Sequence, residues 1–200
     1  MGRTVDYYFA PQSPWAYLGH QRFADIVRRA GARIRVLPID LGGKVFPISG
    51  GLPLGQRAPQ RQAYRLVELQ RFSQHLGAPL NLKPRYFPVG GDDAARLIIA
   101  TDLALGVDAA MAISGAVLAA CWAQERNIAD DKVLAQLLQE QGLPAALLEQ
   151  SHSQAVQVRY EACTQQAIDA GVFGAPSYVI DGEIFWGQDR LDFVERALAD

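Results

Sequence analysis

Residues 172–191 read VFGAPSYVIDGEIFWGQDRL, and this stretch decides the fold. Two short apolar runs, at Ser177–Ile180 and Glu183–Trp186, are joined by an Asp-Gly pair. An Asp-Gly pair between two such runs is the strongest local signal for a β-hairpin. A proline stands directly before the first run, and a closing helix is predicted over 187–200. The chain therefore ends in the order strand, strand, helix.

The other end of the chain predicts a β-α-β unit within forty residues. The run Thr4–Phe9 is rich in β-branched and aromatic residues, which favours a strand. Ser13 and Pro14 then suit the N-cap and the first position of a helix, and Gly31 suits its end. A second strand is predicted over 34–39.

Between these ends the sequence is almost wholly helical. Residues 42–59 are dense in Gly and Pro and predict a long loop, a length that is typical of functional or mobile segments. Helices are predicted over 60–76, 92–105, 108–124, 130–141, 144–149 and 151–170. We therefore expect one unit from 1–58 and 151–200, with 59–150 as an inserted helical domain.

Composition excludes several classes of protein. The 200 residues are 50% hydrophobic and carry 19 Lys and Arg against 21 Asp and Glu. This balance is that of a globular chain without a basic nucleic-acid footprint. We expect no secretory signal, because the first residues lack a charged start followed by an apolar run, and no membrane span. The location we expect is cytoplasmic. The three histidines show no paired spacing, so we expect no metal site.

The order β-α-β, helices, then α-β-β-α is that of the thioredoxin fold. Where a dithiol enzyme of this fold has Cys-x-x-Cys, the chain has Ser13-Pro14-Trp15-Ala16. Its two cysteines, Cys121 and Cys163, lie 42 positions apart in predicted helices, which argues against disulfide exchange. Ala175-Pro176 occupies the place where the fold has a proline, usually cis, before its third strand.

Together, SPWAYLG at 13–19, LVELQRF at 66–72 and the C-terminal stretch resemble the 2-hydroxychromene-2-carboxylate isomerase family. This family is related to the kappa-class glutathione transferases in the DsbA-like branch of the thioredoxin superfamily. The resemblance covers essentially the whole chain. It implies an α/β, thioredoxin-like (DsbA-type) fold with a large all-helical insertion. It also implies a glutathione-dependent enzyme that acts on an aromatic carboxylate, commonly as a homodimer.

The resemblance gives roles to individual residues. Ser13 matches the serine that faces the glutathione thiol, and a helix N-terminus favours a thiolate there. The Ala175-Pro176 backbone would pair with the cysteinyl backbone of glutathione. Gln188 and Asp189 would bind its γ-glutamyl end, and Arg61 a carboxylate. On the residues alone, Ser13 or Asp189 could be only an N-cap, and Arg61 part of a solvated helix face. Relatives often have Gly-Asn in the long loop, where this chain has Gly50-Gly51-Leu52-Pro53.

Aromatic side chains are candidate walls of a substrate pocket, although such residues in an α/β protein are more often core. The candidates are Trp15, Tyr17, Tyr86, Phe87 and Trp186. Arg190 could hold the substrate carboxylate or only brace the site. The expected reaction is a cis-trans isomerisation through reversible thiolate addition. The alternatives are a kappa-like transferase that conjugates electrophiles or reduces peroxides, and a binding module without activity.

Overall fold

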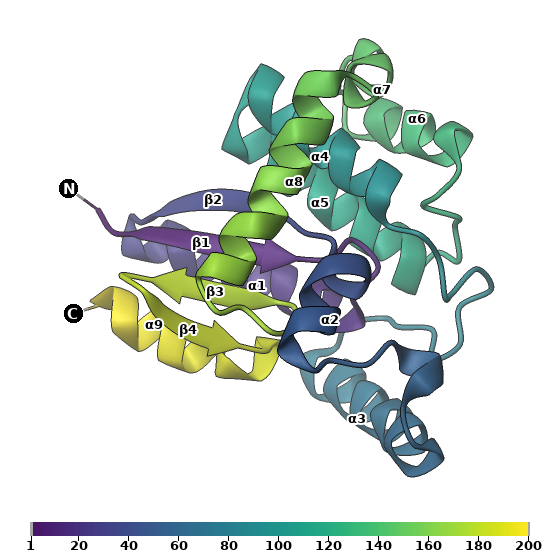
Figure 1. The fold of residues 1–200 in the computed structure, drawn as a ribbon, viewed down its shortest axis with the longest axis vertical. Helices are drawn as coiled ribbons and strands as arrows, with labels where there is room; N and C mark the ends of the chain where they lie inside the picture. The colour runs from purple at the N-terminus through teal and green to yellow at the C-terminus, as the bar shows by residue number, and fades with distance from the viewer. Residues whose placement is uncertain (1, 200) are drawn as a thin grey trace.

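A four-stranded sheet organises the computed structural model, which describes residues 2–199 (Figure 1). The strand order is β2-β1-β3-β4, with β1 and β2 parallel and the other two pairs antiparallel. The strands are β1 (Thr4–Phe9), β2 (Arg33–Pro38), β3 (Ser177–Ile180) and β4 (Glu183–Trp186). All four predicted strands are confirmed, with β2 shifted by one residue. The two ends of the chain thus meet in one sheet, because β1 pairs with β3.

Both faces of the sheet are covered by helices. Tyr7 and Phe9 of β1 share the larger core cluster with helix α1 (Pro14–Ala30) and helix α9 (Leu191–Ala199). Tyr8, which points to the opposite face, packs with helix α8 (Gln154–Asp169), seen crossing the strands in Figure 1. This alternation follows from the two-residue period of a strand. Helix α1 begins shortly after the carboxyl end of β1.

Helix α1 begins and ends where its sequence signals predict. The Ser13 side chain accepts a hydrogen bond from the Ala16 N–H at 3.2 Å, and Pro14 fills the first turn. Gly31 closes the helix at a φ of 62°, where its N–H donates to Arg28, and the Ala32 N–H reaches Val27. This left-handed conformation costs least for glycine.

The helical block also follows the predictions, apart from the long loop. The remaining helices are α3 (Pro59–Leu76), α4 (Asp92–Leu105), α5 (Val107–Trp122), α6 (Asp131–Glu140) and α7 (Ala146–Ser151). The long loop predicted over 42–59 is partly helical: it contains most of a π-helical turn over Leu41–Val45, helix α2 (Phe46–Ser49) and a 3₁₀ turn over Leu54–Gln56. The Asp40 carboxylate accepts from the Gly43 N–H at 2.7 Å, and this cap nucleates the helical turns.

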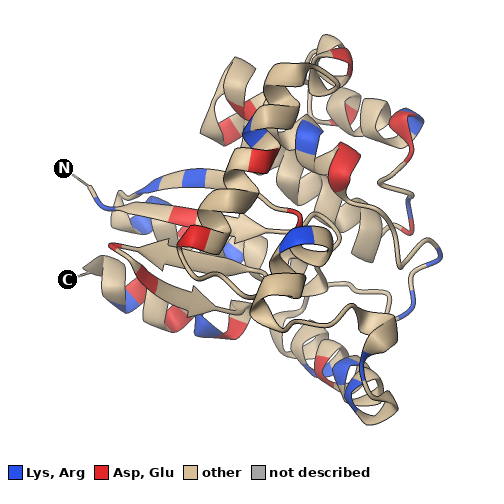
Figure 2. Cartoon of the chain, viewed as in Figure 1, with Lys and Arg blue, Asp and Glu red and all other residues tan. Residues whose placement is uncertain are grey.

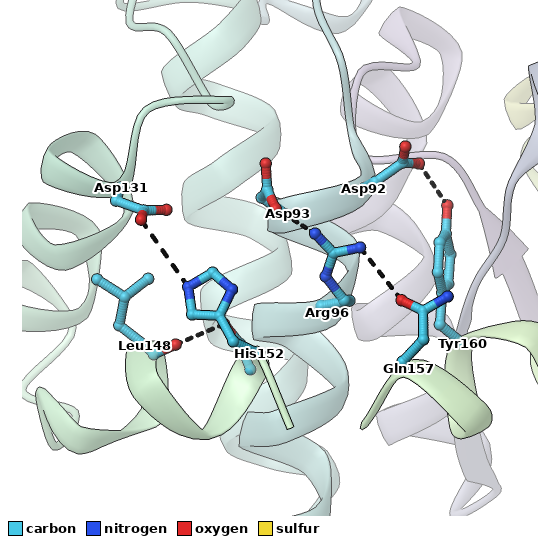
Figure 3. A network of polar contacts seen from close by, with 9 residues as sticks. Asp92, Asp93, Arg96, Asp131, Leu148, His152, Gln157 and Tyr160 are labelled. Carbon is cyan, nitrogen blue, oxygen red and sulfur yellow. Dashed lines mark hydrogen bonds and ion pairs between the residues drawn. The ribbon is translucent and has the colours of Figure 1, made fainter. Parts of the chain in front are cut away.

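Polar contacts fasten α8 to α4 within the helical block (Figure 3). The Tyr160 hydroxyl donates to Asp92 at 2.8 Å, and Arg96 donates to the Gln157 side chain at 3.2 Å and to Asp93. At the end of α7, His152 lies 3.8 Å from Asp131. Since α8 leads into β3, these contacts hold the helical block against the sheet.

The larger core cluster runs through both halves of the chain. It joins Val5 and Tyr7 of the sheet to Leu134 and Leu147 of the helical block without interruption. The division into two domains therefore stays a prediction, and the two predicted parts share one hydrophobic core. None of the helices within residues 2–199 combines the length and the apolarity that a membrane span needs.

Candidate functional site

Ser13 lies at the N-terminus of α1, with its side chain only 7% exposed. Its hydroxyl accepts from the Ala16 N–H and lies 3.4 Å from the Ala175 carbonyl, to which it donates. The first turn of α1 contains no acidic residue, so no side chain there neutralises the positive end of the helix. A hydroxyl and the positive end of a helix dipole together favour an anion.

The Ala175-Pro176 peptide bond is cis, as predicted, and it faces Ser13. The Pro176 carbonyl accepts from the Gly187 N–H at 2.9 Å, which ties the cis bond to the turn after β4. The Trp186 indole packs directly against Gly174, because a Cβ at Gly174 would lie 2.3 Å from the ring nitrogen. The backbone at 174–176 is thus held between α1 and the end of β4.

Two cavities open beside this backbone and share part of their walls. The helix-end cavity contains Ser13 and has a volume of about 640 Å³. The turn cavity, about 580 Å³, is lined by Gln188, Asp189 and Arg190. The shared wall consists of Trp15, Arg57, Arg61, Arg65, Ala175 and Trp186. A ligand that lies along Ala175 would therefore reach into both.

The two cavities differ in charge. Among the described residues, the walls of the helix-end cavity include three arginines and no carboxylate. The turn cavity has the same arginines together with Arg190, Glu68 and Asp189. The first therefore suits an anion, and the second a group that carries both signs of charge.

Helix α1 holds the turn after β4 through hydrogen bonds from Arg22 to Gln188. Gln188 is buried, and its side-chain oxygen accepts from Arg22 at 3.0 Å; Arg22 also reaches the Gln188 carbonyl at 3.3 Å. Asp189 is exposed to the cavity and pairs with Arg190 at 3.0 Å. The structure therefore brings the predicted residues 188–190 together with Ser13 and Ala175. Of these three, Asp189 and Arg190 present charge to a ligand.

Arg61 belongs to a stripe of arginines that was only partly predicted. Arg57, Arg61 and Arg65 recur every four residues along and just before α3, and Figure 2 shows blue segments gathered there. Burial and the neighbouring Arg57 lower the pKa of Arg65 to about 10, so its guanidinium stays charged at neutral pH. Arg57 and Arg65 were not singled out from sequence, although residues 57–67 contain three arginines and no acid.

Not every predicted aromatic wall lines a cavity. Trp15 and Trp186 line both cavities, and Phe87 lines the helix-end cavity. Tyr17 and Tyr86 line neither: the Tyr17 hydroxyl donates to the Pro79 carbonyl at 2.6 Å, and Tyr86 stacks with Arg85 at the surface. For Tyr17 this is a tertiary contact, which a spacing pattern does not reveal.

The long loop contributes walls to the helix-end cavity. Residues 49–54 line the helix-end cavity, and Phe46 lies against Gly51, where a Cβ would stand 2.1 Å from the ring. The segment Gly50–Pro53 therefore offers apolar surface and backbone groups to a ligand.

The cysteines lie away from this site. Cys121 and Cys163 are buried in separate core clusters. Burial raises the pKa of both thiols, that of Cys121 to about 12. Within residues 2–199, no group of three or more His, Cys, Asp or Glu side chains is arranged to hold a metal ion.

Comparison with known proteins agrees with this architecture. The DSBA-like thioredoxin domain family matches residues 4–199. 2-Hydroxychromene-2-carboxylate isomerase from Sphingobium xenophagum is 33% identical over 201 residues, covering all of both chains. The enzyme of the same name from Pseudomonas putida is 32% identical and covers 97% of this chain and 93% of its own.

A solved structure of selenomethionine 2-hydroxychromene-2-carboxylate isomerase superposes with a TM-score of 0.82, at 29% identity, over 98% of this chain and 94% of the other. These matches confirm the predicted DsbA-like thioredoxin fold with its helical insertion. By full-length identity and by fold, the chain belongs to the 2-hydroxychromene-2-carboxylate isomerase family of DSBA-like thioredoxin proteins.

Proposed function

We propose that the protein is a glutathione-dependent isomerase that acts on 2-hydroxychromene-2-carboxylate or a similar aromatic carboxylate. One observation carries this proposal: the Ser13 hydroxyl stands at an uncompensated helix N-terminus and opens into a cavity whose described walls carry three arginines and no carboxylate. Its relatives bear the name of an isomerase of such a carboxylate, which agrees with this charge.

The residues of the site fit glutathione. A tripeptide that pairs with the Ala175 backbone would place its cysteine beside Ser13, since the Ser13 hydroxyl already reaches the Ala175 carbonyl. Its γ-glutamyl end, which carries an ammonium and a carboxylate, matches the turn cavity, where Asp189 faces arginines. Arg61 lies in the shared wall and would take a carboxylate.

When bound, glutathione supplies a thiolate that adds reversibly to the conjugated system and so permits rotation about the former double bond. The chain's own residues prepare this chemistry. The Ser13 hydroxyl and the start of α1 stabilise negative charge beside Ala175. The arginines orient the anionic substrate, while Trp15, Phe87 and Trp186 enclose its ring and exclude water.

The test is a turnover assay that also counts thiols. The purified protein is mixed with 2-hydroxychromene-2-carboxylate, and the benzylidenepyruvate product is followed by absorbance with glutathione, with S-methylglutathione, or with neither. Free thiol is titrated at the end. We expect turnover only with glutathione, and no loss of thiol. Turnover without glutathione would refute the cofactor. Stoichiometric loss of thiol would instead favour the kappa-like transferase.

A further inference from the structure

We propose that Arg65 is a specificity-determining residue, which selects aromatic substrates bearing an anionic group by holding that group in the helix-end cavity. This inference rests on the proposed function, because it names the chemical class of substrate that this site prefers. Arg65 differs from Arg57 and Arg61, its neighbours in the stripe, because its guanidinium lies against two aromatic rings.

The guanidinium of Arg65 lies against two aromatic rings. Its central carbon is 5.3 Å from the centre of the Phe87 ring and 5.5 Å from that of Trp122. Arg65 lines both cavities, and Phe87 lines only the helix-end cavity, so the Arg65 guanidinium is stacked on a wall of the helix-end cavity. Stacking fixes the plane of a guanidinium and leaves the N–H groups at its edge available to a ligand.

The same stack is tied to the residue next to Ser13. The Trp122 indole N–H donates to the Gln12 carbonyl at 3.2 Å, and Gln12 precedes Ser13. Arg65, Trp122 and Gln12 thus form a continuous series of contacts that ends at the start of α1. Arg65 and Ser13 also line the same helix-end cavity, so these contacts connect the positive charge to the segment that carries Ser13.

No acidic side chain pairs with Arg65 among residues 2–199. Its helix neighbour Arg71, by contrast, pairs with Glu68 at 2.8 Å, and Arg57 donates to the Leu52 carbonyl at 2.8 Å. Arg65 is half-buried, and a partly desolvated cation without an acidic partner gains most from an anion that the ligand supplies. A neutral ligand of the same shape brings no such gain, so the cavity discriminates by charge.

The experiment measures binding without catalysis. Calorimetry in the absence of glutathione compares trans-cinnamate with its neutral isostere trans-cinnamamide, for the wild type, Arg65→Met, Arg65→Lys and Arg71→Met. Methionine keeps much of the length and apolar contact but removes the charge. Arg71→Met makes the same change on the same helix outside both cavities, and near-UV circular dichroism checks that each variant is folded.

We expect Arg65→Met to lower the affinity for cinnamate at least about tenfold, as loss of a hydrogen bond to a charged group implies. The affinity for cinnamamide should change less than about twofold, Arg65→Lys should recover part of the preference, and Arg71→Met should resemble the wild type. An equal loss for both ligands would overturn the inference, because it would mean that Arg65 only packs. The inference would also be overturned if Arg65→Met bound cinnamate as tightly as the wild type does. It would be overturned as well if the wild type did not bind cinnamate.

The turnover assay separates this inference from the proposed function. In an active enzyme, Arg65→Met should raise KM for the aromatic acid while KM for glutathione changes less than about twofold. If the protein does not isomerise the chromene but still prefers cinnamate through Arg65, the proposed function fails and the charge selection stands. If it isomerises the chromene with an unaltered KM in Arg65→Met, the reverse holds.

Discussion

The Ser13 hydroxyl combines two tasks, since it caps α1 and faces the Ala175 carbonyl across the cavity. Ser13→Ala should leave the fold intact, lower the free energy of unfolding by about 0.5–2 kcal/mol as a lost N-cap, and lower turnover at least about tenfold. Ser153→Ala is the matched control, because Ser153 caps α8 in the same way. Equal turnover in the two variants would refute the role of Ser13 beyond capping.

Asp189 presents a carboxylate to the turn cavity, next to Arg190. Asp189→Asn should raise the glutathione concentration needed for half-maximal rate several-fold, with a smaller effect on the rate at saturation, because an ammonium loses its counter-charge. Initial rates over a range of glutathione concentrations measure both quantities. Asp192→Asn, the same change just beyond the turn, serves as the control; an unaltered glutathione dependence in Asp189→Asn would exclude this contact.

At the residue scale, the sequence predicts best those site residues whose signal is local. Ser13 precedes a proline at a helix start, and Pro176 precedes a strand, so both could be placed without the structure. Arg65 could not, because its position depends on Phe87 and Trp122, which lie 22 and 57 positions further along the chain. Tyr17 was wrongly predicted as a pocket wall for the same reason: nothing local indicates that its hydroxyl donates to Pro79.

Helix α1 approaches the turn after β4 so closely that a side chain does not fit between them. A Cβ on Gly19 would lie 2.8 Å from the Gln188 Cβ and 2.9 Å from the Tyr178 hydroxyl. Gly19→Ala should therefore destabilise the protein by about 1–3 kcal/mol, less what alanine gains in a helix. It should also raise KM for glutathione by displacing residues 188–190. Gly55→Ala, which has open space, is the control in urea unfolding and kinetics; an unchanged Gly19→Ala would contradict this packing.

His20 joins α1 to both the sheet and α5. Its Nε2 lies 3.0 Å from the Met111 carbonyl and its Nδ1 3.3 Å from the Tyr7 hydroxyl, so we assign the proton to Nε2. Burial lowers the pKa of His20 below its ordinary value of 6.5. Between the two pKa values, the unfolded chain binds a proton that the folded chain does not. The contribution of neutral His20 to the free energy of unfolding is therefore complete above about pH 6.5 and is lost as the pH falls below it.

His20→Gln removes that titration. We expect the free energy of unfolding of the wild type to fall more steeply between pH 7 and pH 5 than that of His20→Gln, by up to about 1.4 kcal/mol per pH unit. Urea unfolding at each pH gives both slopes, with exposed His75→Gln as the control. Parallel slopes for the wild type and His20→Gln would show that His20 does not carry this pH dependence.

At the element scale, most helices were predictable because they run for more than two turns between residues that end a helix, such as Gly31 and Gly77. The segment 42–59 was not, since its short helical turns depend on one carboxylate cap at Asp40 and on Phe46 packing over Gly51. Gly and Pro density indicates where a regular element stops. It does not indicate which brief turns replace it.

For the whole molecule, the shared core decides how the protein unfolds. Because one cluster joins the sheet to α5, α6 and α7, we expect residues 59–150 to unfold together with the rest. Urea unfolding followed by far-UV circular dichroism and by tryptophan fluorescence should give coincident curves, since Trp122 lies in the helical block and Trp15 and Trp186 outside it. Two separate midpoints would show that the insertion is an independent unit. The homodimer expected from the resemblance stays a prediction.

The burial of Cys121 and Cys163 has a consequence for survival in the presence of peroxides. Oxidants attack the thiolate form of cysteine. Burial keeps both thiols from ionising readily, and the two residues lie in separate core clusters. Conditions that inactivate a dithiol relative by oxidising its own cysteines would leave Cys121 and Cys163 as thiols. Under the proposed function, oxidants would then act on the activity through the small thiol that serves as cofactor, and not through the protein's own cysteines.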